Sequence, residues 1–154
     1  MVPRPPLAIE MLAIAAAGLS TCHTRRGAVI FTRQHEPFGY ITPPRVLARG
    51  RNYHPIGAAC QGGCGRTAVH AEMAALLNVV QRPYGGAELV HARLNQVGGL
   101  AVSGPPRCAD CAKAIVAAGF ISWVWLYHRD GWRPYHPIDF YSLSIRNEFA
   151  SLAS

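Results

Sequence analysis

His70-Ala71-Glu72 and Pro106-Arg107-Cys108-Ala109-Asp110-Cys111 are the two stretches that decide how this chain folds. Apolar residues recur at helical spacing after each stretch, so each is predicted to begin a helix. Cys108 and Cys111 are three residues apart, lie on one face of such a helix and can bind one ion together. The partial positive charge of a helix N-terminus favours the thiolate form that a metal requires. The sequence therefore predicts two helix N-termini directed at one metal ion.

These side chains are the groups that a hydrolytic zinc site requires. In such a site three protein ligands hold the metal, water takes the fourth position, and a carboxylate that is not a ligand moves protons. A structural zinc site has four protein ligands instead. Cys60 or Cys64 could supply the fourth, and this second interpretation stays open at the level of sequence.

The two stretches together resemble the H-x-E…P-C-x-x-C signature of the zinc-dependent cytidine and deoxycytidylate deaminase superfamily. The resemblance implies a Zn²⁺ ion on His70, Cys108 and Cys111, with Glu72 transferring protons. Arg107 stands before Cys108, where the common form of the signature has proline directly before the cysteine. This departure bears on the geometry of the loop and leaves the ligand count unchanged.

The resemblance also implies a set of substrate contacts. Gly50-Arg51-Asn52 is similar to a G-x-N element whose asparagine binds the sugar, although Asn52 could also be an ordinary turn residue. Arg25 and Arg26 follow a Ser-Thr-Cys sequence similar to the opening of deoxycytidylate deaminases. There they would bind phosphate, or else form a solvated pair in a loop. Ala71 and Ser103 complete the set, with the carbonyl or hydroxyl of Ser103 facing the base.

The other elements follow from periodicity and turn residues. We expect a helix over 7–19, a hairpin of strands 27–32 and 46–53 around a loop over 33–45, and a helix from 70 to about 81. A central strand 87–94, a turn region over 95–104 and a helix from 108 to 119 follow. Strands 120–127 and 132–136 come last, before a terminal helix or tail over 139–150. The turn at Arg129-Asp130-Gly131 makes the last two strands antiparallel. With the resemblance, the fold class is α/β: a three-layer α/β/α sandwich with a five-stranded mixed sheet and both zinc-binding helices on one face.

Cys60 and Cys64 lie in a glycine-rich segment over 57–67, just before His70, and are predicted to be in a loop. With Cys22, and with His54 or His23, they could bind a second metal ion. Free buried thiols are the alternative.

Composition bounds the class of protein. The 154 residues are expected to form one domain over 1–154, and 50% hydrophobic against 15% charged residues excludes a disordered chain. Five cysteines, an odd number, argue against a disulfide framework and for the reducing cytoplasm. The apolar run over 7–19 resembles a signal peptide, but Glu10 interrupts it and it is too short to cross a bilayer. We expect a buried helix there, a cytoplasmic location and no membrane partner.

The resemblance implies hydrolytic deamination of the cytosine of a free nucleotide or nucleoside, which gives uracil and ammonia. The net charge of +7 also favours polyanionic partners. The alternative is a polynucleotide deaminase acting on cytosine or adenine in single-stranded DNA or RNA. A non-catalytic metal-binding module is a third interpretation, against which Glu72 argues. Low charge and a largely apolar helix after His70 predict a homo-oligomer, a dimer or tetramer.

Overall fold

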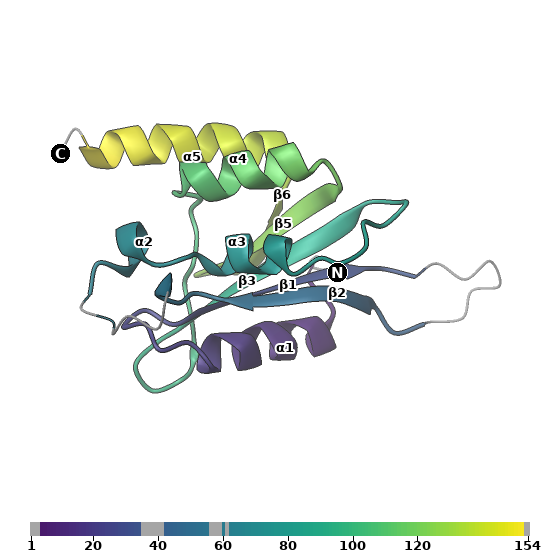
Figure 1. Cartoon of the computed structure of the whole chain (residues 1–154), viewed down its shortest axis with the longest axis horizontal. Helices are drawn as coiled ribbons and strands as arrows, with labels where there is room; N and C mark the ends of the chain where they lie inside the picture. The colour runs from purple at the N-terminus through teal and green to yellow at the C-terminus, as the bar shows by residue number, and fades with distance from the viewer. Residues whose placement is uncertain (1–3, 35–41, 56–59, 61, 153–154) are drawn as a thin grey trace.

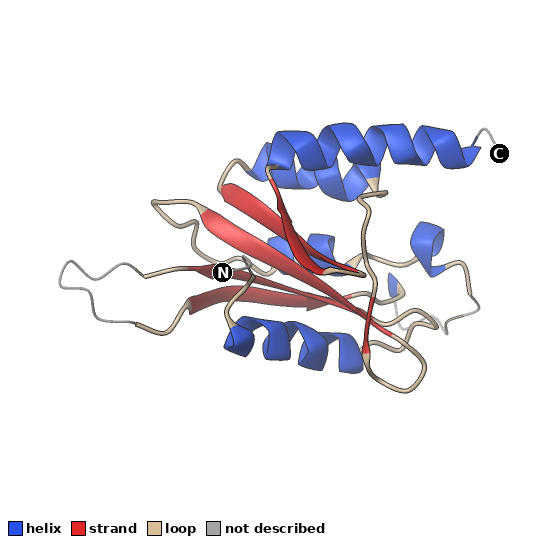
Figure 2. Cartoon of the chain, turned by 180° about the vertical axis from the view of Figure 1, so that it is seen from behind, coloured by secondary structure: helices blue, strands red, loops and turns tan. Residues whose placement is uncertain are grey.

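A mixed β-sheet with helices on both faces makes up the protein. The computed structural model describes residues 4–34, 42–55, 60 and 62–152. Helix α1 (Leu7–Gly18) covers one face of the sheet, and α3 (Ala71–Leu77), α4 (Ala109–Ala118) and α5 (Pro137–Leu152) lie on the other (Figure 1; Figure 2). The predicted three-layer α/β/α sandwich is confirmed, with the two helices that follow His70 and Cys108 on one face.

The strands run in the order β2-β1-β3-β5-β6. Strand β3 (Ala87–Leu94) is central, antiparallel to β1 (Arg26–Thr32) and parallel to β5 (Ile121–His128). Strands β2 (Arg45–Arg51) and β6 (Gly131–Tyr135) form the two edges, and β6 runs antiparallel to β5, as predicted from the turn. The segment predicted as a turn region contains a short strand, β4 (Leu100–Ala101), which pairs with β3, so the sheet has six strands within the described part of the chain.

Two glycines of the β1–β2 hairpin bring helix backbones into contact with the sheet. A Cβ atom on Gly27 would lie 2.3 Å from the carbonyl oxygen of Ala13 in α1, and one on Gly50 would lie 2.3 Å from the amide nitrogen of Ala75 in α3. Only glycine permits such close approach. Helices α1 and α3 therefore pack directly on opposite faces of the same hairpin, and the first turn of α3 is fixed against β2.

Three local expectations need correction or fall outside the structure. Helix α3 ends at Leu77, not near residue 81, and the Asn78 amide next to it donates to the carbonyl of Arg49 at 2.9 Å. The segment predicted as a loop over 57–67 contains a short helix, α2 (Cys64–Thr67). Of the loop predicted over 33–45, residues 35–41 lie outside the described residues, as do 57–59 and 61 of the glycine-rich segment.

No helix among the described residues combines the length and apolar character needed to cross a bilayer.

Candidate functional site

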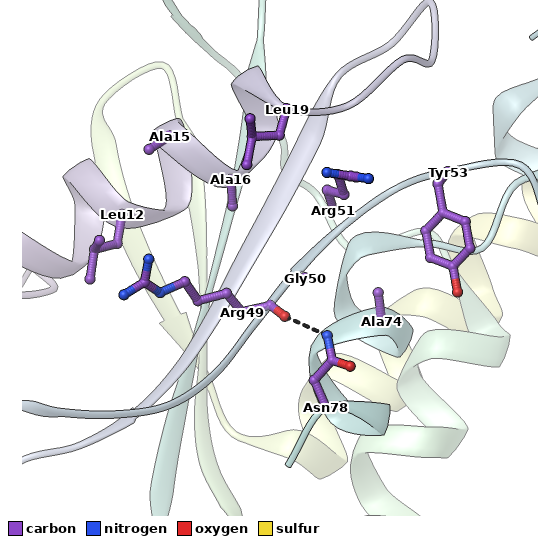
Figure 3. A pocket seen from close by; sticks show the side chains of 10 residues that line it. All are labelled: Leu12, Ala15, Ala16, Leu19, Arg49, Gly50, Arg51, Tyr53, Ala74 and Asn78. Atoms are coloured by element: carbon purple, nitrogen blue, oxygen red, sulfur yellow. Dashed lines mark hydrogen bonds between the residues drawn. The ribbon is translucent and has the colours of Figure 1, made fainter. Parts of the chain in front are cut away.

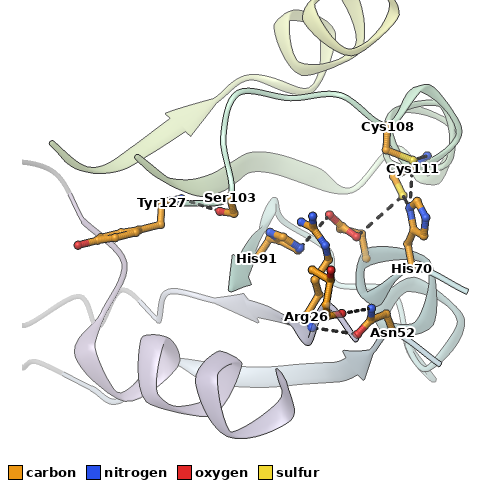
Figure 4. Close-up of polar contacts among 10 residues, drawn as sticks. Arg26, Asn52, His70, His91, Ser103, Cys108, Cys111 and Tyr127 are labelled. Atoms are coloured by element: carbon orange, nitrogen blue, oxygen red, sulfur yellow. Dashed lines mark hydrogen bonds and ion pairs between the residues drawn. The ribbon is translucent and has the colours of Figure 1, made fainter. Parts of the chain in front are cut away.

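His70, Cys108 and Cys111 converge on the same face of the sheet. His70 directly precedes α3 and Cys108 directly precedes α4, so the ends of both helices point toward the group. The His70 Nδ1 atom lies 3.1 Å from Cys111 Sγ and 3.2 Å from Cys108 Sγ (Figure 4). All three atoms lie within 4.8 Å of one another, so they could hold one metal ion. The convergence of the two helix N-termini is as the sequence predicted.

The donor set fits zinc. One imidazole nitrogen and two thiol sulfurs are ligands that zinc prefers, and a three-ligand set is typical of sites that keep a position open. Cys60 and Cys64, which the sequence left open as a fourth ligand here, belong to a different group of side chains. Among the described residues, the His70 group therefore has three protein donors.

Hydrogen bonds in the first turn of α4 shift the pKa values of the two thiols. The backbone N–H of Cys111 donates to Cys108 Sγ at 3.2 Å, so Cys108 caps its own helix. The side-chain hydrogen bond from Cys111 lowers the pKa of Cys108 to about 5. The same contact, together with burial, raises the pKa of Cys111. These opposite shifts favour the thiolate form at Cys108 and the thiol form at Cys111.

Glu72 is buried beside this group. Its Oε2 atom lies 3.9 Å from Cys111 Sγ, and its Oε1 atom lies 3.5 Å from Nε2 of His91 on β3. Burial by itself raises the pKa of the Glu72 carboxyl, but His91, Arg26 and His70 lower it below its ordinary value. Glu72 thus faces the thiol pair as a carboxylate held by neighbouring basic side chains.

His91 and Arg26 play different electrostatic parts around Glu72. Burial lowers the pKa of His91 to about 4, so its ring is neutral near pH 7. Arg26, the first residue of β1, stays protonated although burial lowers its pKa, and it supplies the lasting positive charge opposite Glu72. Figure 4 shows both side chains directed toward the space between the sheet and the His70 group.

Among solved structures, the chain is similar to the dCMP deaminase of cyanophage S-TIM5 in its apo form. The TM-score is 0.52 at 24% sequence identity, over 76% of this chain and 77% of that one. The chain has the cytidine deaminase-like fold. Two further neighbours of this fold are the same phage enzyme in complex with dCMP and dUMP, with TM-score 0.48, 24% identity and coverage of 79% and 82%, and a mutant cytidine deaminase from Mycobacterium tuberculosis, with TM-score 0.46, 19% identity and coverage of 86% and 90%.

The sequence matches no protein-family model and none of the curated proteins, so the likeness rests on three-dimensional structure. It confirms the resemblance read from the sequence at the level of the fold. The cytidine deaminase-like fold places His70, Glu72 and the cysteine pair together at the ends of two helices, as described above.

Asn52, the predicted sugar contact of this cytidine deaminase-like protein, is 2% exposed and engaged internally. Its Oδ1 atom accepts from Ser20 Oγ at 2.6 Å and from the backbone N–H of Arg26 at 2.9 Å, and its Nδ2 atom donates to the carbonyl of Thr24 at 2.7 Å. An amide can form four hydrogen bonds. Three are used to hold the segment between α1 and β1 against the end of β2.

The other predicted substrate contacts occupy varied positions. Ala71 is fully buried in the first turn of α3. The Ser103 hydroxyl accepts from the backbone N–H of Tyr127 at 3.0 Å, which fixes the loop before α4 to β5. Arg25 donates to the carbonyl of Asn95 at 3.2 Å, whereas Arg26 faces Glu72, so the pair is not a solvated loop pair.

Helix α5 holds the loop that carries Cys108, a role the sequence analysis missed. The Asn147 amide donates to the carbonyl of Pro106 at 2.7 Å, and the Glu148 carboxylate accepts from the backbone N–H of Ala109 at 2.9 Å. Glu148 thus caps α4 from another helix, where a negative charge is favourable. Helix α5 lies along α4 at the top of Figure 1.

A separate cavity of about 370 Å³ opens at the β2 edge, between α1 and α3 (Figure 3). Arg49, Arg51 and Tyr53 contribute to its walls. None of the site residues predicted from the sequence lines it, so it is distinct from the His70 group.

Proposed function

We propose that this protein is a zinc-dependent hydrolytic deaminase acting on the cytosine of a free nucleotide or nucleoside. The observation that carries the proposal is the convergence of three zinc-type donors, with one buried carboxylate beside them that is not among the three. The cytidine deaminase-like fold supports it. A purely structural metal site would have no use for that carboxylate.

The assigned ligands are His70, Cys108 and Cys111. A zinc ion bound there would lower the pKa of a water molecule to about 7. Glu72, whose ionised form the charge of Arg26 favours, would accept a proton from water and return protons to the ring nitrogen and the departing amine. Water and cytosine then become uracil and ammonia. Burial of Glu72 keeps bulk solvent from competing for these protons.

His91 acts as a positioning residue in this scheme. Its neutral ring offers one N–H, and Nε2 is the nitrogen nearest the Glu72 carboxylate. Both ring nitrogens are buried and have no protein hydrogen-bond partner among the described residues. We assign His91 to orienting Glu72. Asn52 retains one amide hydrogen for a sugar hydroxyl, and Arg25 remains the phosphate candidate.

A polynucleotide substrate is the second candidate, favoured by surface features. Arg45, Arg49 and Arg51 are exposed on edge strand β2, and Trp123 on β5 is 43% exposed. Arginine follows a phosphate backbone and tryptophan can stack on an unpaired base. A single-stranded nucleic acid would have to extend from these surfaces to the His70 group.

One assay separates the candidates. Zinc-loaded protein is incubated with deoxycytidylate, with cytidine and with a cytosine-containing oligonucleotide, and released ammonia is measured. We expect release from a free nucleotide or nucleoside, falling by about 10²–10⁴-fold in Glu72→Gln, the range that general acid–base catalysis contributes. The variant should keep its zinc. Release from the oligonucleotide alone would select the second candidate, and no release from any substrate would contradict both.

A further inference from the structure

A second group of metal-type ligands lies apart from the His70 group. Cys22, His54, Cys60 and Cys64 each offer one ligand atom, and these four atoms all lie within 4.8 Å of one another. All three cysteines are free thiols. With the two thiols of the His70 group, the two clusters account for all five cysteines of the chain.

The distances in this group approach those of a tetrahedral site. Metal–ligand bonds of about 2.0–2.3 Å place the ligand atoms of a tetrahedron roughly 3.3–3.8 Å apart. The Sγ atoms of Cys60 and Cys64 are 3.3 Å apart, and Cys64 Sγ lies 3.9 Å from Nε2 of His54. Three sulfurs and one imidazole nitrogen are a ligand set of closed, structural zinc sites.

Ordinary packing does not account for the grouping. Buried free cysteines behave as small apolar residues, and Cys22 and Cys64 are buried, but Cys60 is only half-buried. The nearest polar contacts of Cys60 are Cys64 and the exposed His23, whose Nδ1 atom lies 2.9 Å away. Thiols and imidazoles that face one another in this way are placed to bind an ion.

The four residues come from three segments that are separate in the sequence. Cys22 follows α1, His54 follows β2, and Cys60 and Cys64 lie before and at the start of α2, which is on the left side of Figure 1. The same region leads directly into the His70 group, because Tyr53 and Val69 form an antiparallel bridge one residue before His70.

We propose that Cys22, His54, Cys60 and Cys64 bind a structural zinc ion that is separate from the ion of the His70 group. The ion joins the end of α1 to the segment between β2 and α3. It releases the protons of those thiols that are protonated when it binds. The proposal does not depend on the substrate of the His70 group, or on whether that group is catalytic.

Metal content tests the proposal. Protein purified without chelator is analysed by elemental mass spectrometry, and we expect two zinc ions per chain. His54→Ala should lower this to one, and so should Cys111→Ser, which removes a ligand of the other group. His23→Ala is the matched control, because His23 contacts Cys60 but lies outside the four-residue group, and it should retain both ions.

A measurement on the unaltered protein covers the case in which a variant fails to fold. Cobalt(II) is titrated into metal-free protein, and the visible absorption of tetrahedral cobalt–thiolate sites is followed. We expect the signal to saturate at two equivalents, with a thiol reagent reacting more slowly at all five cysteines after loading. One zinc ion per chain that Cys111→Ser abolishes, or saturation at one equivalent of cobalt, would overturn the proposal. Retention of two ions by folded His54→Ala would overturn the ligand set.

Discussion

Replacing Asn52 with alanine distinguishes a structural residue from a substrate contact. The change removes hydrogen bonds to Ser20 Oγ, the backbone N–H of Arg26 and the carbonyl of Thr24. Each bond contributes about 0.5–1.5 kcal/mol net, and a buried partner left without one costs about 1–3 kcal/mol. We therefore expect Asn52→Ala to lose about 3 kcal/mol of unfolding free energy, because the partners cannot all reach water.

Thermal unfolding at fixed protein and zinc concentrations measures this loss. In a chain of this size about 3 kcal/mol lowers Tm by roughly 6–12 °C. Ser20→Ala is the matched control: it removes one hydrogen-bond partner of the Asn52 side chain but leaves the amide in place, so KM should be unchanged and the loss of unfolding free energy should be smaller than in Asn52→Ala. In the double variant the two losses should be less than additive, since both remove the same bond.

An Asn52→Ala protein with unchanged Tm and a raised KM would refute this reasoning. That result would assign the amide to the sugar, as the sequence resemblance implies, and its internal hydrogen bonds would contribute little to stability.

Three substitutions and one measurement of molecular size test the surroundings of the His70 group. Glu148→Ala removes the carboxylate that caps α4. We expect the free energy of unfolding to fall by about 1 kcal/mol and zinc to be retained less well during chelator competition. Unchanged zinc retention would show that α5 does not support the loop that carries Cys108. Where a Cβ fits, a glycine-to-alanine change stabilises a protein by about 0.4–1 kcal/mol. At Gly50 no Cβ fits, so Gly50→Ala should instead lower the free energy of unfolding, by more than that amount. A rise in Tm would contradict the close packing of α3. His91→Leu should still fold and bind zinc, and should change kcat more than KM. General acid–base catalysis contributes about 10²–10⁴-fold to the rate, and we expect kcat to fall by part of that factor. An unchanged kcat would contradict a positioning role for His91. Light scattering should show a dimer or tetramer, because Leu77 at the C-terminal end of α3 is 72% exposed; a 16.7 kDa species would contradict assembly.

Features of the fold and the candidate site that depend on local spacing could be predicted from the sequence. Cys108, the N-cap of α4, and Cys111 in its first turn lie close together because they are three residues apart. The turn at Arg129-Asp130-Gly131 was predicted correctly to give an antiparallel β5–β6 pair. The fold class followed from the helical and strand patterns together with the resemblance to the deaminase superfamily.

Other features depend on contacts between distant segments, and no local pattern encodes them. Asn147 and Glu148 look like ordinary exposed residues of a terminal helix until that helix is placed along α4. His23 and His54 are equally plausible ligands in the sequence, and the path of the chain decides between them. Helix α3 stops early where the amide of Asn78 reaches the carbonyl of Arg49, a contact that the apolar periodicity cannot reveal.

The glycine contacts on the two faces of the β1–β2 hairpin have a mechanical consequence. Gly27 and Gly50 occupy neighbouring registers, with Gly27 opposite Arg51 and Ala28 opposite Gly50. Backbone meets backbone on both sides, so no flexible side chain lies between α1 and α3 at this point to absorb a displacement. Tilting α1 against the sheet therefore also loads the start of α3. A single hairpin of backbone therefore separates α1 from the helix that begins next to His70.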